Sequence, residues 1–136
     1  MAGPEDITLF SSVDRTKEPD FFKRFLDEGN KLPGIIASKP IILGGLQLTG
    51  GEKVLDAGCG LGDDTFEIAQ IVGSKGHVVG IDVSETMILE ARHRASGRVR
   101  NQPSAGLPQV RVNTSNRGAG KHSCSARLPV GLICTR

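Results

Sequence analysis

The residues best suited to chemistry are a glycine-rich segment and an acid that follows it at a fixed distance. Residues 56–62 read Asp-Ala-Gly-Cys-Gly-Leu-Gly, and Asp82 comes 20 residues after Gly62. Glycines let a backbone turn sharply and approach a ligand without a Cβ clash. A carboxylate at the end of the next strand can accept hydrogen bonds from both hydroxyls of a ribose. The pattern therefore predicts a site for a nucleotide-type ligand.

The glycine spacing distinguishes a dinucleotide from a nucleoside-type ligand without phosphate. A dinucleotide fingerprint, G-x-G-x-x-G, starting at Gly58 would need a glycine where Asp63 stands, and Asp64 follows. Both acids suit the positive end of a helix, but they would repel a pyrophosphate, so we interpret them as helix acids. We expect a ligand with a ribose, no phosphate and a positive charge, and S-adenosylmethionine fits. A fragment of a nicotinamide-dependent oxidoreductase is the alternative, and Asp63 argues against it.

Short apolar runs place this loop between two strands. Residues 53–56 predict a buried strand, a helix begins near Asp63 and is capped by Gly73, and residues 77–82 predict a second strand. The helix has one apolar face, made of Leu61, Thr65, Ile68, Ala69 and Val72. A strand–helix–strand unit implies a parallel pair with a right-handed crossover. The expected fold is α/β, Rossmann-like and doubly wound.

Further helical segments flank this unit. Pro19 and Asp20 open a helix with Asp20 as its N-cap, and its apolar positions are Phe22, Phe25, Leu26 and Leu32. A second apolar segment starts at Pro33. Pro40 interrupts it, which predicts two short helices or one kinked helix. After the second strand, Ser84 can cap a helix whose apolar face is formed by Met87, Ile88, Ala91 and Ala95.

The two motifs together resemble those of class I S-adenosylmethionine-dependent methyltransferases. Residues 54–62 are similar to the first motif of that family and residues 78–84 to the second, so residues 53–95 match its first βαβα unit. Residues 21–48 resemble the helical lead-in of the branch that includes ubiquinone and menaquinone C-methyltransferases. The resemblance covers roughly residues 8–95. It implies S-adenosylmethionine as cofactor and a small-molecule methyl acceptor.

The resemblance also implies roles for individual residues. Asp56 would organise the loop and approach the methionine amino group, and Gly58, Gly60 and Gly62 would form the floor under the methionine part. Asp82 would hold the ribose hydroxyls, Val83 would pack on the adenine, Met87 could flank it, and Cys59 would be a small buried residue beside the cofactor. Simpler structural alternatives are a loop-capping role for Asp56 and a core role for Met87. For the helix at residues 22–32 we favour plain packing over a role as a substrate lid, although the resemblance implies that lead-in helices often border the substrate. The motifs assign no catalytic residue and no metal ligand.

Composition divides the chain. All 15 acids lie at or before Glu90, whereas residues 91–136 carry nine bases, no acid and few large apolar residues. Only residues 109–112 and 130–133 have strand character there. We therefore divide the chain into a helical lead-in (1–50), a βαβα unit (51–95) and an irregular basic tail (96–136). We interpret the tail as something other than the native continuation, so that the methyltransferase is incomplete. A frameshift, a truncated gene or a divergent tail could each explain it.

Other classes of protein receive less support. A basic tail could bind nucleic acid, but it lacks aromatic stacking residues. A non-catalytic fragment, in contrast, is as well supported for this chain as an active enzyme. The sequence contains no apolar run of membrane-spanning length and no signal-peptide pattern at its start. Three cysteines (Cys59, Cys124 and Cys134) without a C-x-x-C pair argue against disulfides and zinc, and favour the cytoplasm. The oligomeric state is left open.

Overall fold

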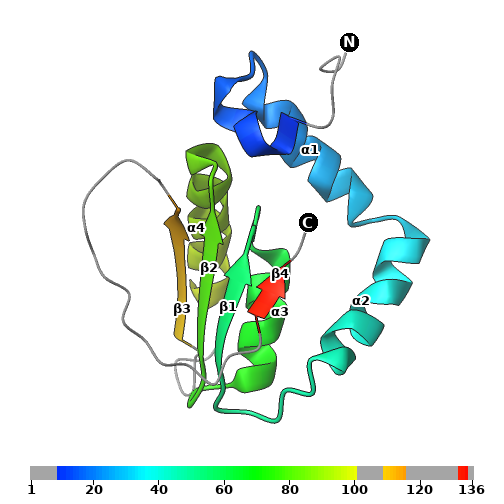
Figure 1. Ribbon diagram of the computed structural model, residues 1–136, viewed down its shortest axis with the longest axis vertical. Helices are drawn as coiled ribbons and strands as arrows, with labels where there is room; N and C mark the ends of the chain where they lie inside the picture. Colours follow the sequence, from blue (N-terminus) through cyan, green and yellow to red (C-terminus); the bar gives the residue numbers. More distant parts are fainter. Residues whose placement is uncertain (1–8, 101–108, 116–131, 135–136) are drawn as a thin grey trace.

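The protein forms a parallel sheet flanked by helices, as a computed structural model shows for residues 9–100, 109–115 and 132–134 (Figure 1). In chain order the elements are η1 (Leu9–Arg15), α1 (Pro19–Gly29), α2 (Pro33–Gly45), β1 (Lys53–Ala57), α3 (Asp63–Val72), β2 (His77–Asp82), α4 (Glu85–Arg100), β3 (Gln109–Thr114) and β4 (Leu132–Cys134). The strand order is β3-β2-β1-β4. The predicted Rossmann-like α/β fold is confirmed.

Strand register brings the loops after β1 and β2 to one edge of the sheet. All three strand pairs are parallel, and Asp56 of β1 lies opposite Gly80 of β2. Helix α3 connects β1 to β2, and α4 connects β2 to β3, so both helices cover the same face of the sheet (Figure 1). Because the carboxyl ends of parallel strands meet at one edge, the glycine loop and Asp82 are neighbours.

The core lies between the sheet and α3. Ile68, Ala69 and Val72 of α3 pack on Val54 of β1 and Val78 of β2, and all five are at most 5% exposed. The other face of the sheet is less covered by the described part of the chain, because alternate residues of β1 and β2 are only half-buried. The sheet therefore has one closed face and one partly open face.

The lead-in differs in detail from the prediction. Helix α1 begins at Pro19 with Glu18 at the N-cap, two positions before the expected N-cap Asp20, which lies in the first turn instead. Proline is favoured in the first helical turn because its missing N–H would have no partner there. The helix ends at Gly29, so Leu32 is not part of it. The apolar segment that follows forms the single helix α2, which contains Pro40.

Part of the predicted tail adds regular structure. Helix α4 continues to Arg100, five residues beyond the expected boundary at Ala95, and both segments with strand character contribute a strand. Val112 of β3 is 7% exposed and packs in a cluster with Cys59, Ile88 and Ala91. Arg92 fastens α4 to β3 by donating from Nε to the Val112 carbonyl (3.1 Å). Residues 101–108, 116–131 and 135–136 lie outside the described residues, and they carry four of the nine bases found after residue 90.

Candidate cofactor site

The glycine loop adopts a conformation that side chains disfavour. Gly60 and Gly62 have φ values of +52° and +80°, in the left-handed region. A Cβ at Gly62 would also lie 3.0 Å from Phe66 and 3.3 Å from Ala91. The glycine at this position is therefore needed both for the turn into α3 and for the close packing of α3 against α4.

Asp82 holds the glycine loop against the end of β2. Its Oδ2 accepts a hydrogen bond from the Gly60 N–H (2.9 Å), and its Oδ1 accepts one from the Ser84 N–H (2.8 Å). The N–H groups of Gly58 and Cys59 donate to the Ile81 carbonyl at 2.8 and 3.0 Å. The half-buried carboxylate thus stands at the junction of the two motifs, where the sequence predicts a ribose partner.

A cavity of about 620 Å³ opens at this edge of the sheet. Six of the eight predicted residues line it: Gly58, Cys59, Gly60, Asp82, Val83 and Met87. Gly62 stands at the N-cap of α3. Asp56 is fully buried, and its Oδ2 accepts a hydrogen bond from Thr65 Oγ1 (2.6 Å). The structure therefore places Asp56 behind the cavity, as a carboxylate that ties β1 to α3, and its ligand role stays a prediction.

The apolar lining residues differ in exposure. Val83 is 57% exposed, so its side chain is open to a ligand, whereas Met87 is 2% exposed and packs with Val13, Phe22 and Leu61. Cys59 is 8% exposed. Burial, together with the negative charges of nearby carboxylates, raises the pKa of its thiol to about 12. The thiol is therefore protonated at neutral pH, which fits a small apolar wall residue.

The lead-in supplies a wall of the cavity that the sequence did not reveal. Its lining residues from these elements are Phe10, Ser11, Phe25, Leu26, Asn30 and Lys39, and Ser115 lines it after β3. Phe25 and Leu26 were visible as apolar positions of a helix for which we favoured plain packing over a place at the substrate site, whereas both line the cavity. Isolated polar residues such as Asn30 and Lys39 carry no local pattern, because their partners lie far along the chain.

Asp14 fastens η1 to the start of α4, beside Asp82. Its Oδ1 accepts hydrogen bonds from Ser84 Oγ (2.7 Å) and the Thr86 N–H (3.1 Å), and its Oδ2 accepts one from the Glu85 N–H (2.7 Å). Partial burial acts to raise the pKa of Asp14, but these hydrogen bonds outweigh it and hold the pKa below its usual 3.8. Ser84 also accepts a hydrogen bond from the Met87 N–H, as expected for a cap (3.2 Å).

Charges at the start of α3 are paired with residues of other helices. Asp63 accepts hydrogen bonds from Asn30 Nδ2 (3.2 Å) and from Arg98 (3.0 Å). Lys39 Nζ lies 3.0 Å from Asp64 Oδ1 and 3.3 Å from Glu67 Oε1. Burial acts to lower the pKa of Lys39, but these two carboxylates raise it above its usual 10.5. Lys39 therefore stays protonated at neutral pH, and its positive charge lies between α2 and α3.

The described residues offer neither a metal site nor a membrane-spanning helix. They contain no group of three or more His, Cys, Asp or Glu side chains that could hold a metal ion. None of the helices within the described ranges is both long and apolar enough to span a membrane.

Comparison with known proteins identifies the segment that carries the site. The family profile of the methyltransferase domain matches residues 48–101. These residues are therefore similar to the methyltransferase domain. The match includes both motifs and the strands and helices that position them. It confirms the predicted resemblance to S-adenosylmethionine-dependent methyltransferases and, with it, the expected cofactor.

Individual relatives of this methyltransferase segment act on different acceptors. The chain is 50% identical over 50 residues to the 23S rRNA uracil C5-methyltransferase RlmD of Acinetobacter baumannii, covering 37% of this chain and 11% of that protein. It is 54% identical over 48 residues to the aklanonic acid methyltransferase DauC of a Streptomyces species, covering 35% and 22%. Both matches span less than a quarter of the relative.

A solved structure is similar over a limited part of the chain. An S-adenosylmethionine-dependent methyltransferase from Aquifex aeolicus is 31% identical, with a TM-score of 0.48. The match covers 57% of this chain and 38% of that one.

Proposed function

We propose that residues 48–101 bind S-adenosylmethionine and that the chain is part of a cytoplasmic methyltransferase with a small-molecule acceptor. The observation that carries the proposal is the Asp82 carboxylate, which lines the cavity at the end of β2 and accepts the Gly60 N–H. A carboxylate at this place in a Rossmann-like sheet is suited to the two hydroxyls of a ribose. Its hydrogen bond with Gly60 would hold the glycine loop and the end of β2 in a fixed relative position.

The residues present fit this cofactor. Asp82 would hold the ribose, the exposed Val83 and the buried Met87 would contact the adenine, and Gly58 and Gly60 would lie beneath the methionine part. When bound, the cofactor supplies a methyl group already activated on a cationic sulfur. The protein would then need to align the acceptor with that methyl group and to exclude water from the site. Asp56 would support the loop from behind, through its hydrogen bond with Thr65.

The charges around the start of α3 support this ligand over a dinucleotide. Asp63 and Asp64 occupy the first turn of α3 and line the cavity. Both pair with cations of other elements, and neither leaves the helix N-terminus free for a pyrophosphate. A ligand without phosphate and with a cationic sulfur avoids repulsion by these carboxylates.

Calorimetry with S-adenosylhomocysteine tests the proposal. The parent chain is expected to bind, and Asp82→Ala to bind about 10- to 150-fold more weakly, because hydrogen bonds to a charged group contribute roughly 1.5–3 kcal/mol. Asp20→Ala is the matched control, because Asp20 is an exposed acid of α1 outside the cavity. Absence of binding by the parent, or tighter binding of NAD, would overturn the proposal.

A second variant keeps the test valid if Asp82→Ala disturbs the loop. Val83 is 57% exposed, so Val83→Arg leaves the core intact. The longer cationic side chain would occupy the adenine position, and S-adenosylhomocysteine affinity is expected to fall while the thermal midpoint is unchanged. Unchanged affinity would contradict the position assigned to the adenine.

RNA is a second candidate acceptor, because one relative is an rRNA methyltransferase. Tritiated S-adenosylmethionine, incubated with the protein and either total RNA or a small-molecule cell extract, separates the two. We expect the label in the low-molecular-weight fraction. Label in RNA that is lost in Asp82→Ala would favour the RNA acceptor instead.

We also propose that the chain beyond residue 101, where the methyltransferase match ends, is not the native continuation of this domain, although composition alone placed the change at residue 96. The proposal rests on the loss of acids after Glu90 and on the absence of an acid after β3, where Ser115 lines the cavity. Reading the coding DNA beyond codon 95 in the other two frames tests it. A frame that encodes a strand followed by an acid would support a frameshift as the origin of the tail, and two frames without one would contradict a frameshift.

A further inference from the structure

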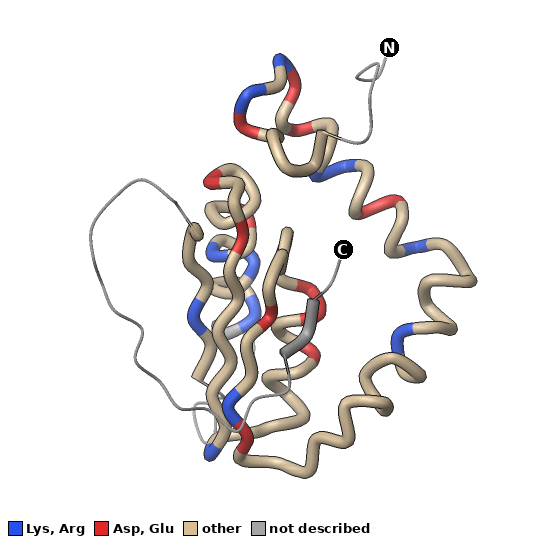
Figure 2. Tube along the Cα trace, in the orientation of Figure 1, with Lys and Arg blue, Asp and Glu red and all other residues tan. Residues whose placement is uncertain are grey.

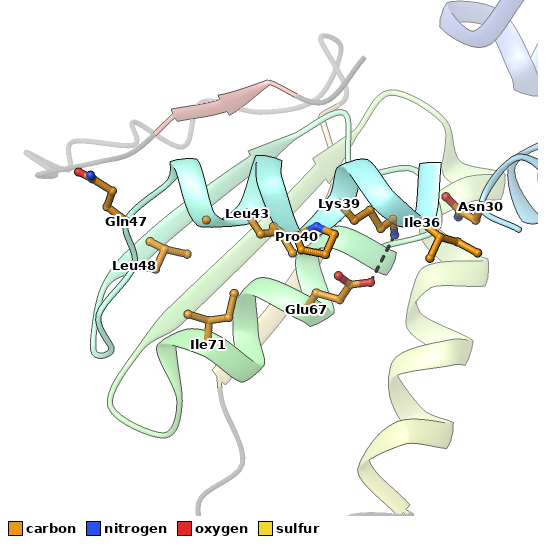
Figure 3. Close-up of a pocket in the computed structure, with 10 residues that line it drawn as sticks. Asn30, Ile36, Lys39, Pro40, Leu43, Gln47, Leu48, Glu67 and Ile71 are labelled. Carbon is orange, nitrogen blue, oxygen red and sulfur yellow. Dashed lines mark hydrogen bonds and ion pairs between the residues drawn. The ribbon is translucent and has the colours of Figure 1, made fainter. Parts of the chain in front are cut away.

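A second hollow adjoins the cofactor cavity. It runs between α2 and α3, measures about 640 Å³, and is lined by Asn30, Ile36, Lys39, Pro40, Leu43, Gly44, Gln47, Leu48, Glu67 and Ile71. Figure 3 shows these side chains along the two helices, with Lys39 reaching toward Glu67. We call this hollow the α2–α3 groove. Asn30 and Lys39 line both the groove and the cofactor cavity, so the two spaces meet at these residues.

The groove is mainly apolar between two polar ends, with Gln47 at one end and Asn30 and Lys39 at the end that meets the cavity (Figure 3). Ile36 and Ile71 are 56% and 42% exposed, although both line it. None of the residues of α2 is buried. Lys39 is the single charged residue of α2, which Figure 2 draws in tan apart from one blue segment. A ligand site commonly has this size, apolar walls and a few polar groups.

We propose that the α2–α3 groove binds the apolar body of the methyl acceptor, with a head that carries no negative charge at Lys39 and Asn30. The acceptor role of the bound molecule rests on the proposed function. The binding of an apolar molecule in the groove does not depend on it. Asn30 and Lys39 meet the cavity beside Asp63 and Asp64, at the glycine-loop end assigned to the methionine part. A head held there would lie next to the methyl group to be transferred.

The local charges decide the nature of the head. Lys39 is shared by two carboxylates, those of Asp64 and Glu67. One ammonium between two carboxylates leaves no unpaired cation for an anionic head, and the excess negative charge would repel one. A hydroxyl or an amide can instead exchange hydrogen bonds with Asn30. The groove therefore fits an elongated, mostly apolar molecule with a neutral polar end.

Titration of the full chain with 1-decanol tests the groove, with isoleucine methyl groups as NMR reporters. Saturable shifts are expected at Ile36 and Ile71, which line the groove. Ile41 and Ile42 are 76% and 57% exposed on the same helix but do not line it, so they report nonspecific adsorption. Equal shifts at all four positions, or none, would overturn the proposal. Decanoate is expected to bind more weakly than decanol, and equal or tighter binding would overturn the assignment of the head.

Two adjacent glycines offer a matched pair of variants. An added Cβ meets nothing within 4 Å at either Gly44 or Gly45, and both are helical, but only Gly44 lines the groove. Gly44→Leu is expected to fill the groove and to weaken decanol binding by about tenfold or more. Gly45→Leu is expected to leave it unchanged. Equal effects of the two substitutions would contradict the site.

Decanol titrations with and without S-adenosylhomocysteine test the groove separately from the proposed methyltransferase function. Because Asn30 and Lys39 line both spaces, we expect it to change the decanol dissociation constant by about fivefold. An unchanged constant would leave two independent sites and overturn the acceptor role. If the parent binds S-adenosylhomocysteine but not decanol, only the groove fails. If it binds decanol but not S-adenosylhomocysteine, the proposed function and the acceptor role fail, and the groove stands as an apolar site.

Discussion

Helices α2 and α3 form opposite sides of one groove, but they are held in different ways. Helix α3 buries five of its ten residues, among them Ile68 and Val72, whereas α2 buries none of its 13. Part of α2 packs on the core through partly buried Leu43, and its polar ties to α3 run through Lys39. The glycine loop and α3, which form the floor of the candidate site, are therefore fixed to the sheet. The wall formed by α2 is attached by few contacts.

The largest expected difference is in the free energy of unfolding after truncation of equivalent side chains. Ile68 is fully buried in α3, and Ile41 is 76% exposed on α2. Ile68→Ala is expected to cost about 2–5 kcal/mol, and Ile41→Ala less than about 0.5 kcal/mol. Urea unfolding measures both. Similar costs would show that α2 is packed as firmly as α3.

Glycine substitutions sharpen the comparison with effects of opposite sign. Gly62→Ala should destabilise the protein by roughly 1–3 kcal/mol, because φ is positive there and its Cβ would crowd Phe66. Gly44→Ala in α2 should stabilise it by about 0.5–1 kcal/mol, because alanine favours the helix and meets open space. Thermal unfolding of the two variants checks both signs. A stabilising Gly62→Ala would contradict the role of the left-handed turn.

Removal of the Asp14 cap tests how η1 is attached to the domain. Asp14→Ala removes acceptors for three donors at the start of α4. Loss of a helix cap costs about 1 kcal/mol and up to ~2 kcal/mol. The pKa of Asp14 is lowered in the folded state, so its stabilisation is present above the usual 3.8 and is lost as the pH falls through the folded value.

Urea unfolding of the parent chain and Asp14→Ala at pH 7 and at successively lower pH measures this difference. Asp14→Asn is the control, because it keeps one oxygen acceptor without the charge. A difference in stability that persists unchanged below the folded pKa would contradict the role of the carboxylate.

The smallest effect is expected at the contact between α1 and α4. Arg94 donates to both carboxylate oxygens of Asp27, at 2.8 and 2.9 Å. The hydrogen bonds from Arg94 are the main cause that lowers the pKa of Asp27. The pair is partly exposed, so Asp27→Asn should cost about 0.5–1 kcal/mol, and less at high salt. A cost of the same size in 1 M salt would indicate packing, not charge.

The sequence was most informative where the pattern is local. The glycine loop, Asp82 and the Ser84 cap lie within one βαβα unit, whose register follows from strand length and crossover handedness. The strands and α3 were therefore placed correctly, and six of the eight predicted residues line the cavity. Asp56 does not line the cavity, and a buried strand acid can serve either a ligand or a neighbouring helix. The structure provides Thr65 as one partner.

The remaining features depend on contacts between distant segments. Nothing around Asp14 in the sequence shows that its partners are residues 84–86, and nothing near Lys39 points to Asp64. The boundary at Ala95 also missed the last turn of α4, because Ser96, Gly97 and Arg98 interrupt the apolar pattern but do not end the helix. Composition alone predicted an irregular tail. The two short strand patterns within the tail were more accurate, because both segments contribute a strand.

The cap by Asp14 also has a consequence for the order of folding. Its partners lie 70 to 72 residues further along the chain, and closing so long a loop costs entropy before the contacts can form. The βαβα unit closes much shorter loops, so we expect it to form first and η1 to dock afterwards. By the same reasoning η1 detaches most readily from the folded protein. The wall that contains Phe10 and Ser11 would then be the last part of the cavity to assemble and the first to open.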